Sequence, residues 1–198
     1  ERHLRLVFHR FMEAATPLRI LLNGRALQPL DPFGRKHSAT FSDPAEHLTV
    51  SQGDIEIQSF TLPHHRQINQ TDWDDIGGPE GHLKSQGFYL CRGGRLIIHG
   101  TWFGLCRQSE LTKLSRVRID IPNSMDADWK IDVKKSSAQL PPMVRDRLKR
   151  IVERIQAGSK RTYQKLGHKL VDEERLPMWH RIQADGAIRY RPNIEHPA

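Results

Sequence analysis

The stretch that decides the fold reads Arg-Val-Arg-Ile-Asp-Ile over residues 116–121 and Trp-Lys-Ile-Asp-Val over residues 129–133. In both segments apolar and polar side chains alternate with a period of two. That period is typical of a strand with one buried and one exposed face. We therefore predict two strands of an antiparallel sheet, with Arg116, Arg118 and Asp120 on the exposed face.

A helix follows these strands, after a loop that carries Lys134 and Lys135. Its apolar residues recur with helical spacing and form one stripe: Val144, Leu148, Ile151, Val152 and Ile155. An ammonium group on a loop that leaves a rigid strand can contact an anion as a point charge. Lysines in such loops are also commonly solvated, so spacing alone leaves both interpretations open.

The rest of the chain supplies more strands and a few helices. Local patterns predict a helix over residues 2–15, strands over 18–22, 47–50 and 55–62, a long loop over 64–87, a hairpin over 87–105 and a short helix over 109–114. Together they predict an α+β fold, in which helices pack on one face of a mostly antiparallel sheet.

The composition shifts after Gly158, which suggests a second part of the chain. A basic helix over residues 159–174 is followed by a hairpin with strands at 179–182 and 188–190. We expect an α+β domain over residues 1–157 and a helix-plus-hairpin appendage over residues 158–198. Because the sequence opens on Glu1 inside a predicted helix, we also expect a preceding part of the protein.

Charge and cysteine content narrow the class of protein. The formal net charge is +8, which favours polyanionic partners and excludes an acidic, self-repelling tail protein. Cys91 and Cys106 are the two cysteines, and no second pair completes a zinc site, so we expect buried thiols in a reducing, cytoplasmic compartment. No apolar run reaches the roughly 18 residues of a membrane span.

Cations accumulate along the helices after Pro142 and form what we call the basic tract. It comprises Arg145, Lys149, Arg150, Arg154, Lys160, Arg161 and Lys165. Such a tract can bind the phosphate backbone of a nucleic acid. A solvated helix face is the ordinary alternative, and the pattern does not decide between them.

Other chemistry has weaker support. Adjacent His64 and His65 would face opposite sides of a strand and could not easily bind one ion, so we expect no metal site. The glycine-containing loop over residues 77–81 lacks the spacing of a phosphate-binding motif and is better read as a plain loop. No serine or cysteine has an activating partner in the sequence, which argues against nucleophilic catalysis.

A family resemblance is visible at these residues. Residues 129–136 (Trp-Lys-Ile-Asp-Val-Lys-Lys-Ser), 86–89 (Gln-Gly-Phe-Tyr) and 95–97 (Arg-Leu-Ile) resemble one region of a known superfamily. That superfamily joins the ATPases of gyrase, heat-shock chaperones, histidine kinases and MutL (GHKL), and is related to the MORC ATPases. The similarity covers about residues 1–157 and is strongest at 86–151. It is to the transducer-like region after the nucleotide-binding domain.

The resemblance implies a fold and a mechanism. The transducer is expected to have a ribosomal-protein-like β-α-β topology, and one of its lysines reaches the γ-phosphate of ATP bound in the preceding domain. The matching residue here is Lys135, with Lys134 as the alternative. ATP and magnesium would bind the N-terminal nucleotide-binding domain of the same protein, and closure or homodimerisation would follow. The family's water-activating Glu, magnesium-binding Asn and glycine-rich lid have no match here, so we expect the isolated chain to be inactive.

Overall fold

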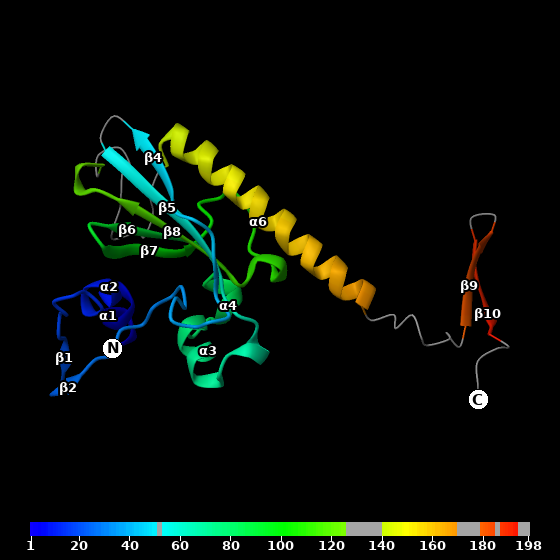
Figure 1. The fold of residues 1–198 in the computed structure, drawn as a ribbon, viewed down its shortest axis with the longest axis horizontal. Helices are drawn as coiled ribbons and strands as arrows, with labels where there is room; N and C mark the ends of the chain where they lie inside the picture. The colour runs from blue at the N-terminus through cyan, green and yellow to red at the C-terminus, as the bar shows by residue number, and fades with distance from the viewer. Residues whose placement is uncertain (51–52, 126–139, 170–178, 185–186, 194–198) are drawn as a thin grey trace. The chain divides into compact units, whose positions relative to one another are not determined.

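The fold is α+β, as predicted, in a computed structural model that describes residues 1–50, 53–125, 140–169, 179–184 and 187–193 (Figure 1). The contacts divide the chain into two units, Glu1–Ala157 and Gly158–Ala198. The first unit holds a six-stranded sheet and nearly all of the buried apolar residues.

The sheet of the first unit is mixed. Its strands are β3 (Phe41–Ser42), β4 (Glu46–Val50), β5 (Gly53–Thr61), β6 (Gly87–Arg92), β7 (Arg95–Thr101) and β8 (Ser115–Ile121). They are ordered β3-β5-β8-β6-β7, and β4 also pairs with β5. All pairs are antiparallel except β6 with β8, which are parallel. β8 therefore lies in the interior of the sheet, with a neighbour on each side.

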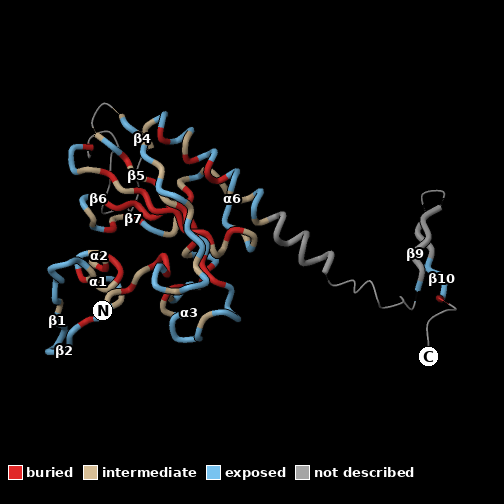
Figure 2. The backbone as a smooth tube through the Cα atoms, viewed as in Figure 1, coloured by how far each residue is buried: buried red, intermediate tan, exposed pale blue. Residues whose placement is uncertain are grey.

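Helix α6 (Pro142–Lys169) covers one face of this sheet through the predicted apolar stripe (Figure 2). Val144, Leu148, Ile151 and Val152 are buried against apolar residues of β5, β6, β7 and β8. Pro142 begins the helix, where its missing N–H costs no hydrogen bond. Alternate residues of β8, including Val117 and Ile119, point to this face, as the period of two predicted.

The opposite face of the sheet is covered as well, so the expectation of helices on one face is wrong. Leu6 of α1 (Arg2–Val7), with Leu30 and Phe33 of the following segment, packs on Phe60, Tyr89, Cys91 and Leu96. Consecutive side chains of a strand point to opposite faces, and β6 places Phe88 and Leu90 in the first core and Tyr89 and Cys91 in the second. The sheet is thus sandwiched between two apolar layers.

This second layer corrects the prediction for β8. Arg116 and Arg118 were expected on an exposed face, but they are 0 % and 8 % exposed. The alternation of the sequence is present, yet residues 1–33 and the segment that contains His82 and Ser85 pack over the polar face and bury it. The predicted partner strand over residues 129–133 lies outside the described residues, and so the β-α-β topology stays a prediction.

The predicted helix over residues 2–15 is interrupted. α1 ends at Val7, Phe8 has φ −105° and ψ 10°, and α2 (His9–Met12) follows. The next segment contains the short hairpin of β1 (Leu21–Leu22) and β2 (Arg25–Ala26). Asn23 and Gly24 form its turn with φ of 50° and 78°, the positive values that an Asn-Gly turn accommodates.

The prediction of a long loop over residues 64–87 is wrong, because this segment contains short helices. They are the 3₁₀ turn η1 (His65–Gln67), α3 (Gln70–Gly77) and α4 (Gly81–Lys84). The side chain of Asn69 accepts a hydrogen bond from the Asp72 N–H and caps α3. Gly78, with φ +73°, ends it. Two further 3₁₀ turns are η2 (Glu110–Thr112) and η3 (Asn123–Met125), η2 lying within the predicted short helix over residues 109–114.

The second unit begins within α6, which runs without a break through Gly158 to Lys169. The expectation of a separate helix starting at Ser159 is therefore wrong, although the predicted hairpin is confirmed. It is formed by β9 (Trp179–Ala184) and β10 (Ala187–Pro192), paired antiparallel.

Candidate functional site

The two lysines singled out by the sequence, Lys134 and Lys135, lie outside the described residues. The structure does describe the positions on either side of them. Met125, in η3 after β8, and Val144, in the first turns of α6, are each 1 % exposed and belong to the same core. The segment that carries the lysines therefore connects an interior strand of the sheet to the helix that covers it.

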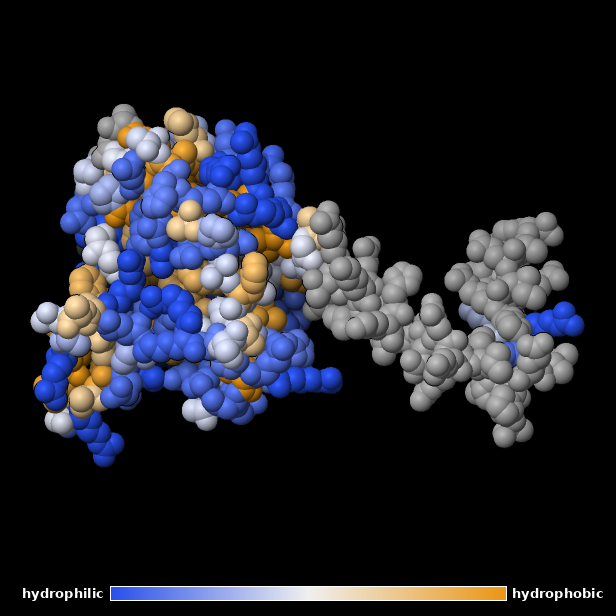
Figure 3. Space-filling model, in the orientation of Figure 1, coloured by the Kyte–Doolittle hydropathy of each residue, from blue (hydrophilic) through white to orange (hydrophobic). Residues whose placement is uncertain are grey.

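The first four residues of the basic tract are exposed, as a surface that binds nucleic acid must be. Arg145, Lys149, Arg150 and Arg154 are exposed on α6, and hydrophilic side chains cover the side of α6 that faces the viewer in Figure 3. Lys160, Arg161 and Lys165 lie farther along α6, where only the backbone is described.

Acidic residues of the fold already engage part of this surface. Arg154 donates to Glu46 of β4 at 2.9 Å and lies 3.9 Å from Asp43, and Arg147 also bonds Glu46. Burial would raise the pKa of Glu46, but the hydrogen bonds from Arg154 and Arg147 outweigh it and lower that pKa. Arg145, Lys149 and Arg150, by contrast, form no ion pair with any residue of the described part.

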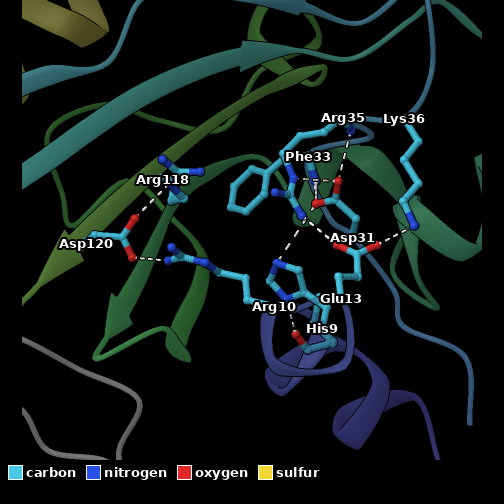
Figure 4. Close-up of polar contacts among 10 residues, drawn as sticks. His9, Arg10, Glu13, Asp31, Phe33, Arg35, Lys36, Arg118 and Asp120 are labelled. Atoms are coloured by element: carbon cyan, nitrogen blue, oxygen red, sulfur yellow. Dashed lines mark hydrogen bonds and ion pairs between the residues drawn. The ribbon is translucent and has the colours of Figure 1, made fainter. Parts of the chain in front are cut away.

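The polar side of β8 carries a chain of ion pairs that the sequence did not reveal. Asp120 bonds Arg10 of α2 through one oxygen, and its other oxygen lies 2.8 Å from Nε of Arg118 (Figure 4). Arg118 in turn bonds Glu56, which is directly opposite Asp120 on β5. The order Arg10–Asp120–Arg118–Glu56 links helix α2 to two strands of the sheet, and we call it the ion-pair ladder.

A second polar group lies next to the ladder, around the buried imidazole of His9. The Nδ1 atom of His9 is 2.7 Å from the carbonyl oxygen of Leu6, so Nδ1 carries the proton and donates. Nε2 then has a lone pair, has no hydrogen-bond partner and faces a carboxylate oxygen of Asp31 at 4.0 Å. Burial lowers the pKa of His9, which keeps the ring neutral at pH 7.

Asp31 holds its own segment in place. Its carboxylate accepts hydrogen bonds from the backbone N–H groups of Phe33 and Arg35, at 3.1 and 2.9 Å, and from the side chain of Arg35 at 2.9 Å. Arg35 and Lys36 both reach Glu13 at 2.7 Å (Figure 4). These contacts fix the turn after Asp31 against the end of α2, and they place Phe33 in the second core.

At the other end of β8, Arg116 is buried without a carboxylate partner among the described residues. It bonds the carbonyl oxygens of Lys113 and Ser115 at 2.9 and 3.1 Å, and Oγ of Ser85 at 2.9 Å. Its remaining contact is Nδ1 of His82 at 3.3 Å. The guanidinium charge is thus solvated by the dipoles of carbonyl groups and a hydroxyl group and not by an anion of the described part. Burial lowers the pKa of Arg116.

Burial and the neighbouring charge of Arg116 lower the pKa of His82 to about 4. The neutral ring has a defined tautomer. Nε2 lies 3.0 Å from the carbonyl oxygen of Trp73 and donates to it, so Nδ1 accepts from Arg116. His82 therefore connects α3, α4 and β8 only while it remains uncharged.

The polar groups described above hold elements of the fold in position and do not form a reactive site. The partly buried carboxylate of Asp120 is paired with Arg10 and Arg118, and the buried imidazoles of His9 and His82 are neutral. Burial raises the pKa of the Cys91 thiol to about 12, which leaves it protonated and unreactive. Among the described residues no group of three or more His, Cys, Asp or Glu lies where it could hold a metal ion. The ladder and the His9 group tie the N-terminal helices to the sheet.

Comparison with known proteins identifies no relative of this chain, because no family model, no curated protein and no solved structure matches it. In the part of the chain that the structure describes, no helix has both the length and the apolar character required to cross a membrane.

The pKa of His82 leads to a prediction about stability and pH. The unfolded chain protonates this residue near 6.5 and the folded protein near 4, so the unfolded state binds the extra proton between these values. The free energy of unfolding should therefore fall by up to about 3 kcal/mol as the pH drops through that interval. In His82→Gln, whose amide can still donate to Trp73, this contribution should disappear. Urea denaturation of both proteins at several pH values measures it, and parallel pH profiles would contradict the assignment.

Proposed function

We propose that this chain is the ATP-sensing, transducer-like region of a larger cytoplasmic GHKL-type ATPase. The resemblance of residues 86–151 to that region is the main support. The observation that best agrees with it is the position of the lysine segment, which joins interior strand β8 to the covering helix α6 through the buried residues Met125 and Val144.

In this proposal Lys135 contacts the γ-phosphate of ATP, with Lys134 as the alternative. ATP and magnesium are bound by an N-terminal nucleotide-binding domain of the same protein. The phosphate favours the closed arrangement of the two domains by the free energy of the contact that it gains there. Closure, and homodimerisation of the ATPase, would then depend on whether the triphosphate is intact.

The ion-pair ladder gives this coupling a route through the described residues. α1 and α2 are the first elements of the chain, and Arg10 of α2 bonds Asp120 on β8. β8 ends at Ile121, and the lysine segment follows soon after. In this proposal, a displacement of the N-terminal helices would be transmitted through the Arg10–Asp120 bond to β8, the strand that precedes the lysines in the sequence.

A second candidate function is nucleic-acid binding by the basic tract. The specific observation in its favour is that Arg145, Lys149 and Arg150 are exposed and form no ion pair with any described residue. Arg154 already bonds Glu46, so it contributes less to the surface that could bind a nucleic acid. The two functions are compatible, because an ATPase can use its transducer to hold a nucleic acid.

Lys135→Ala in the complete ATPase should lower kcat by about tenfold or more, because a charge-assisted contact to the transferring phosphate stabilises the transition state by a few kcal/mol. Lys149→Ala is a matched control, since it removes the same charge from α6 and should leave kcat unchanged. Steady-state hydrolysis assays of the wild type, Lys135→Ala, Lys134→Ala and Lys149→Ala measure the effect. An unaltered kcat in Lys135→Ala would remove this lysine from the mechanism, and the same loss in Lys134→Ala alone would transfer the role to that residue.

For the second function, binding of duplex DNA should weaken steeply with salt. The logarithm of the binding constant should fall by about 0.9 per neutralised phosphate for each decade of salt concentration. Replacing Arg145, Lys149 and Arg150 together by Ala should weaken binding and make that slope shallower.

Fluorescence anisotropy at several salt concentrations tests this expectation. Arg66→Ala with Arg107→Ala removes two exposed charges elsewhere in the first unit and is the control. Binding that does not depend on salt, or that weakens equally in the control, would dismiss the basic tract as the contact surface.

A further inference from the structure

A cavity of about 350 Å³ opens between α1, the loop after α3 and the second face of the sheet. Its volume is at the lower end of the range for small-molecule sites. Apolar side chains, among them Leu6, Leu30 and Ile76, form part of its wall, and the ring of Tyr89 contributes as well. The cavity lies in the first unit and is separate from the ion-pair ladder.

The charges around this cavity are unbalanced. Arg2, Lys84 and the imidazoles of His3 and His99 line it, and Glu80 is the one acidic residue among the lining residues. Lys84 forms no ion pair with a described residue, although Glu80 is only four positions away. Desolvation lowers the pKa of His99, and the positive field of Arg2 and His3 lowers it further.

A neighbouring cavity of similar size has the opposite composition, because carboxylates outnumber the cations that line it. It measures about 370 Å³ and is lined by Arg5 and Lys36 together with four carboxylates: Glu13, Asp31, Asp72 and Asp75. Arg5 bonds Asp75 there, and Lys36 bonds Glu13. The cations of the second cavity are therefore satisfied by the protein itself, whereas those of the first are not.

Arg2 is held in position with unused hydrogen-bonding capacity. Its Nη2 atom donates to the carbonyl oxygen of Asp75 at 2.7 Å, while Nε is buried and has no partner. A Cβ at Gly78 would lie 2.7 Å from Nη2 of Arg2, so the glycine leaves room for the guanidinium. Orphaned buried donors are uncommon in folded proteins and call for a partner.

A further positive charge lies directly behind the cavity. Ser85 lines it, and Oγ of Ser85 accepts a hydrogen bond from Arg116, the buried guanidinium without a carboxylate partner. The ring of His99 stacks on Tyr89 with centroids 5.9 Å apart and planes at 28°. An anion in the cavity would thus face Arg2, Lys84 and His99 directly and would compensate Arg116 at longer range.

We propose that this cavity binds the phosphate group of a small organic phosphomonoester. Arg2 and Lys84 contact the phosphate oxygens, His99 donates a further hydrogen bond, and the apolar wall accommodates the organic part. A dianionic phosphate matches several cationic donors better than a single carboxylate does. The backbone of residues 77–81 does not form the cradle, because the N–H groups of Gly78 and Gly81 already bond the carbonyl oxygens of Asp74 and Gly78.

This inference is independent of the proposed ATPase function. Arg116 lies at the beginning of β8, where it donates to Ser85 of the cavity wall. In the sequence the lysine segment follows the other end of this strand, and the described residues that line the cavity lie between Arg2 and Gly100. A failure of either proposal leaves the other unaffected.

Phenyl phosphate is the probe, titrated into the 198-residue chain by isothermal calorimetry, with inorganic phosphate and benzoate as comparisons. We expect phenyl phosphate to bind with a Kd of about 1 mM or below and more tightly than either comparison. Lys84→Gln and Arg2→Gln should each weaken binding about tenfold, the loss expected for a charge-assisted hydrogen bond. Lys36→Gln, in the neighbouring cavity where Lys36 is already paired with Glu13, is the matched control and should bind normally.

A second readout locates the ligand. The imidazole signals of His99, identified by comparison with His99→Gln, should shift in the NMR spectrum on titration with phenyl phosphate. Absence of saturable binding, equal weakening by Lys36→Gln, a preference for benzoate, or an unshifted His99 would each overturn the proposal.

Discussion

The bond between Asp120 and Arg10 is the interaction on which the rest of the structure depends. β8 lies between β5 and β6, and its polar face is covered by residues from the beginning of the chain. Arg116, Arg118 and Asp120 on that face are therefore wholly or partly removed from water and need partners inside the protein. Asp120 is the partner of two arginines at once, since it contacts both Arg118 of its own strand and Arg10 of α2.

The two arginines of β8 solve the same problem differently. Arg118 is paired with Asp120 and Glu56, so its charge is neutralised within the sheet. Arg116 is surrounded by carbonyl oxygens, a serine hydroxyl and a neutral imidazole, and its charge is not neutralised. The first arrangement joins layers of the fold. The second leaves a positive field beneath a nearby cavity, which is the reason for expecting an anion there.

The fold class could be predicted from the sequence because alternation and helical spacing are local signals. The hairpin of β6 and β7 and the apolar stripe of α6 both follow from them. Burial of the polar face of β8 could not be predicted in this way, since the residues that cover it are distant in sequence: Arg10 is 110 positions before Asp120, and His82 and Ser85 are 34 and 31 positions before Arg116. α3 was missed because it has eight residues and only two large apolar side chains, Trp73 and Ile76, which is too little for a periodic pattern.

The candidate site was predicted only in part. The exposed cations of α6 lie on the helix where the sequence placed them, but the acidic partners of Arg147 and Arg154 come from β4 and the segment before it. Nothing local to α6 indicates those partners. The three charges at alternate positions of residues 116–121 were visible in the sequence. They could not be interpreted as part of the ion-pair ladder, because the sequence did not show that a second layer of the fold covers them.

A double-mutant cycle between Arg10 and Asp120 tests the central claim most directly. The free energy of unfolding is measured by urea denaturation for the wild type, Arg10→Met, Asp120→Asn and the double variant. If the pair fastens the N-terminal helices to β8, the coupling energy should be about 1–3 kcal/mol, because both groups are partly buried. A coupling energy near zero would show that the helices are held by apolar packing alone, and it would contradict the account.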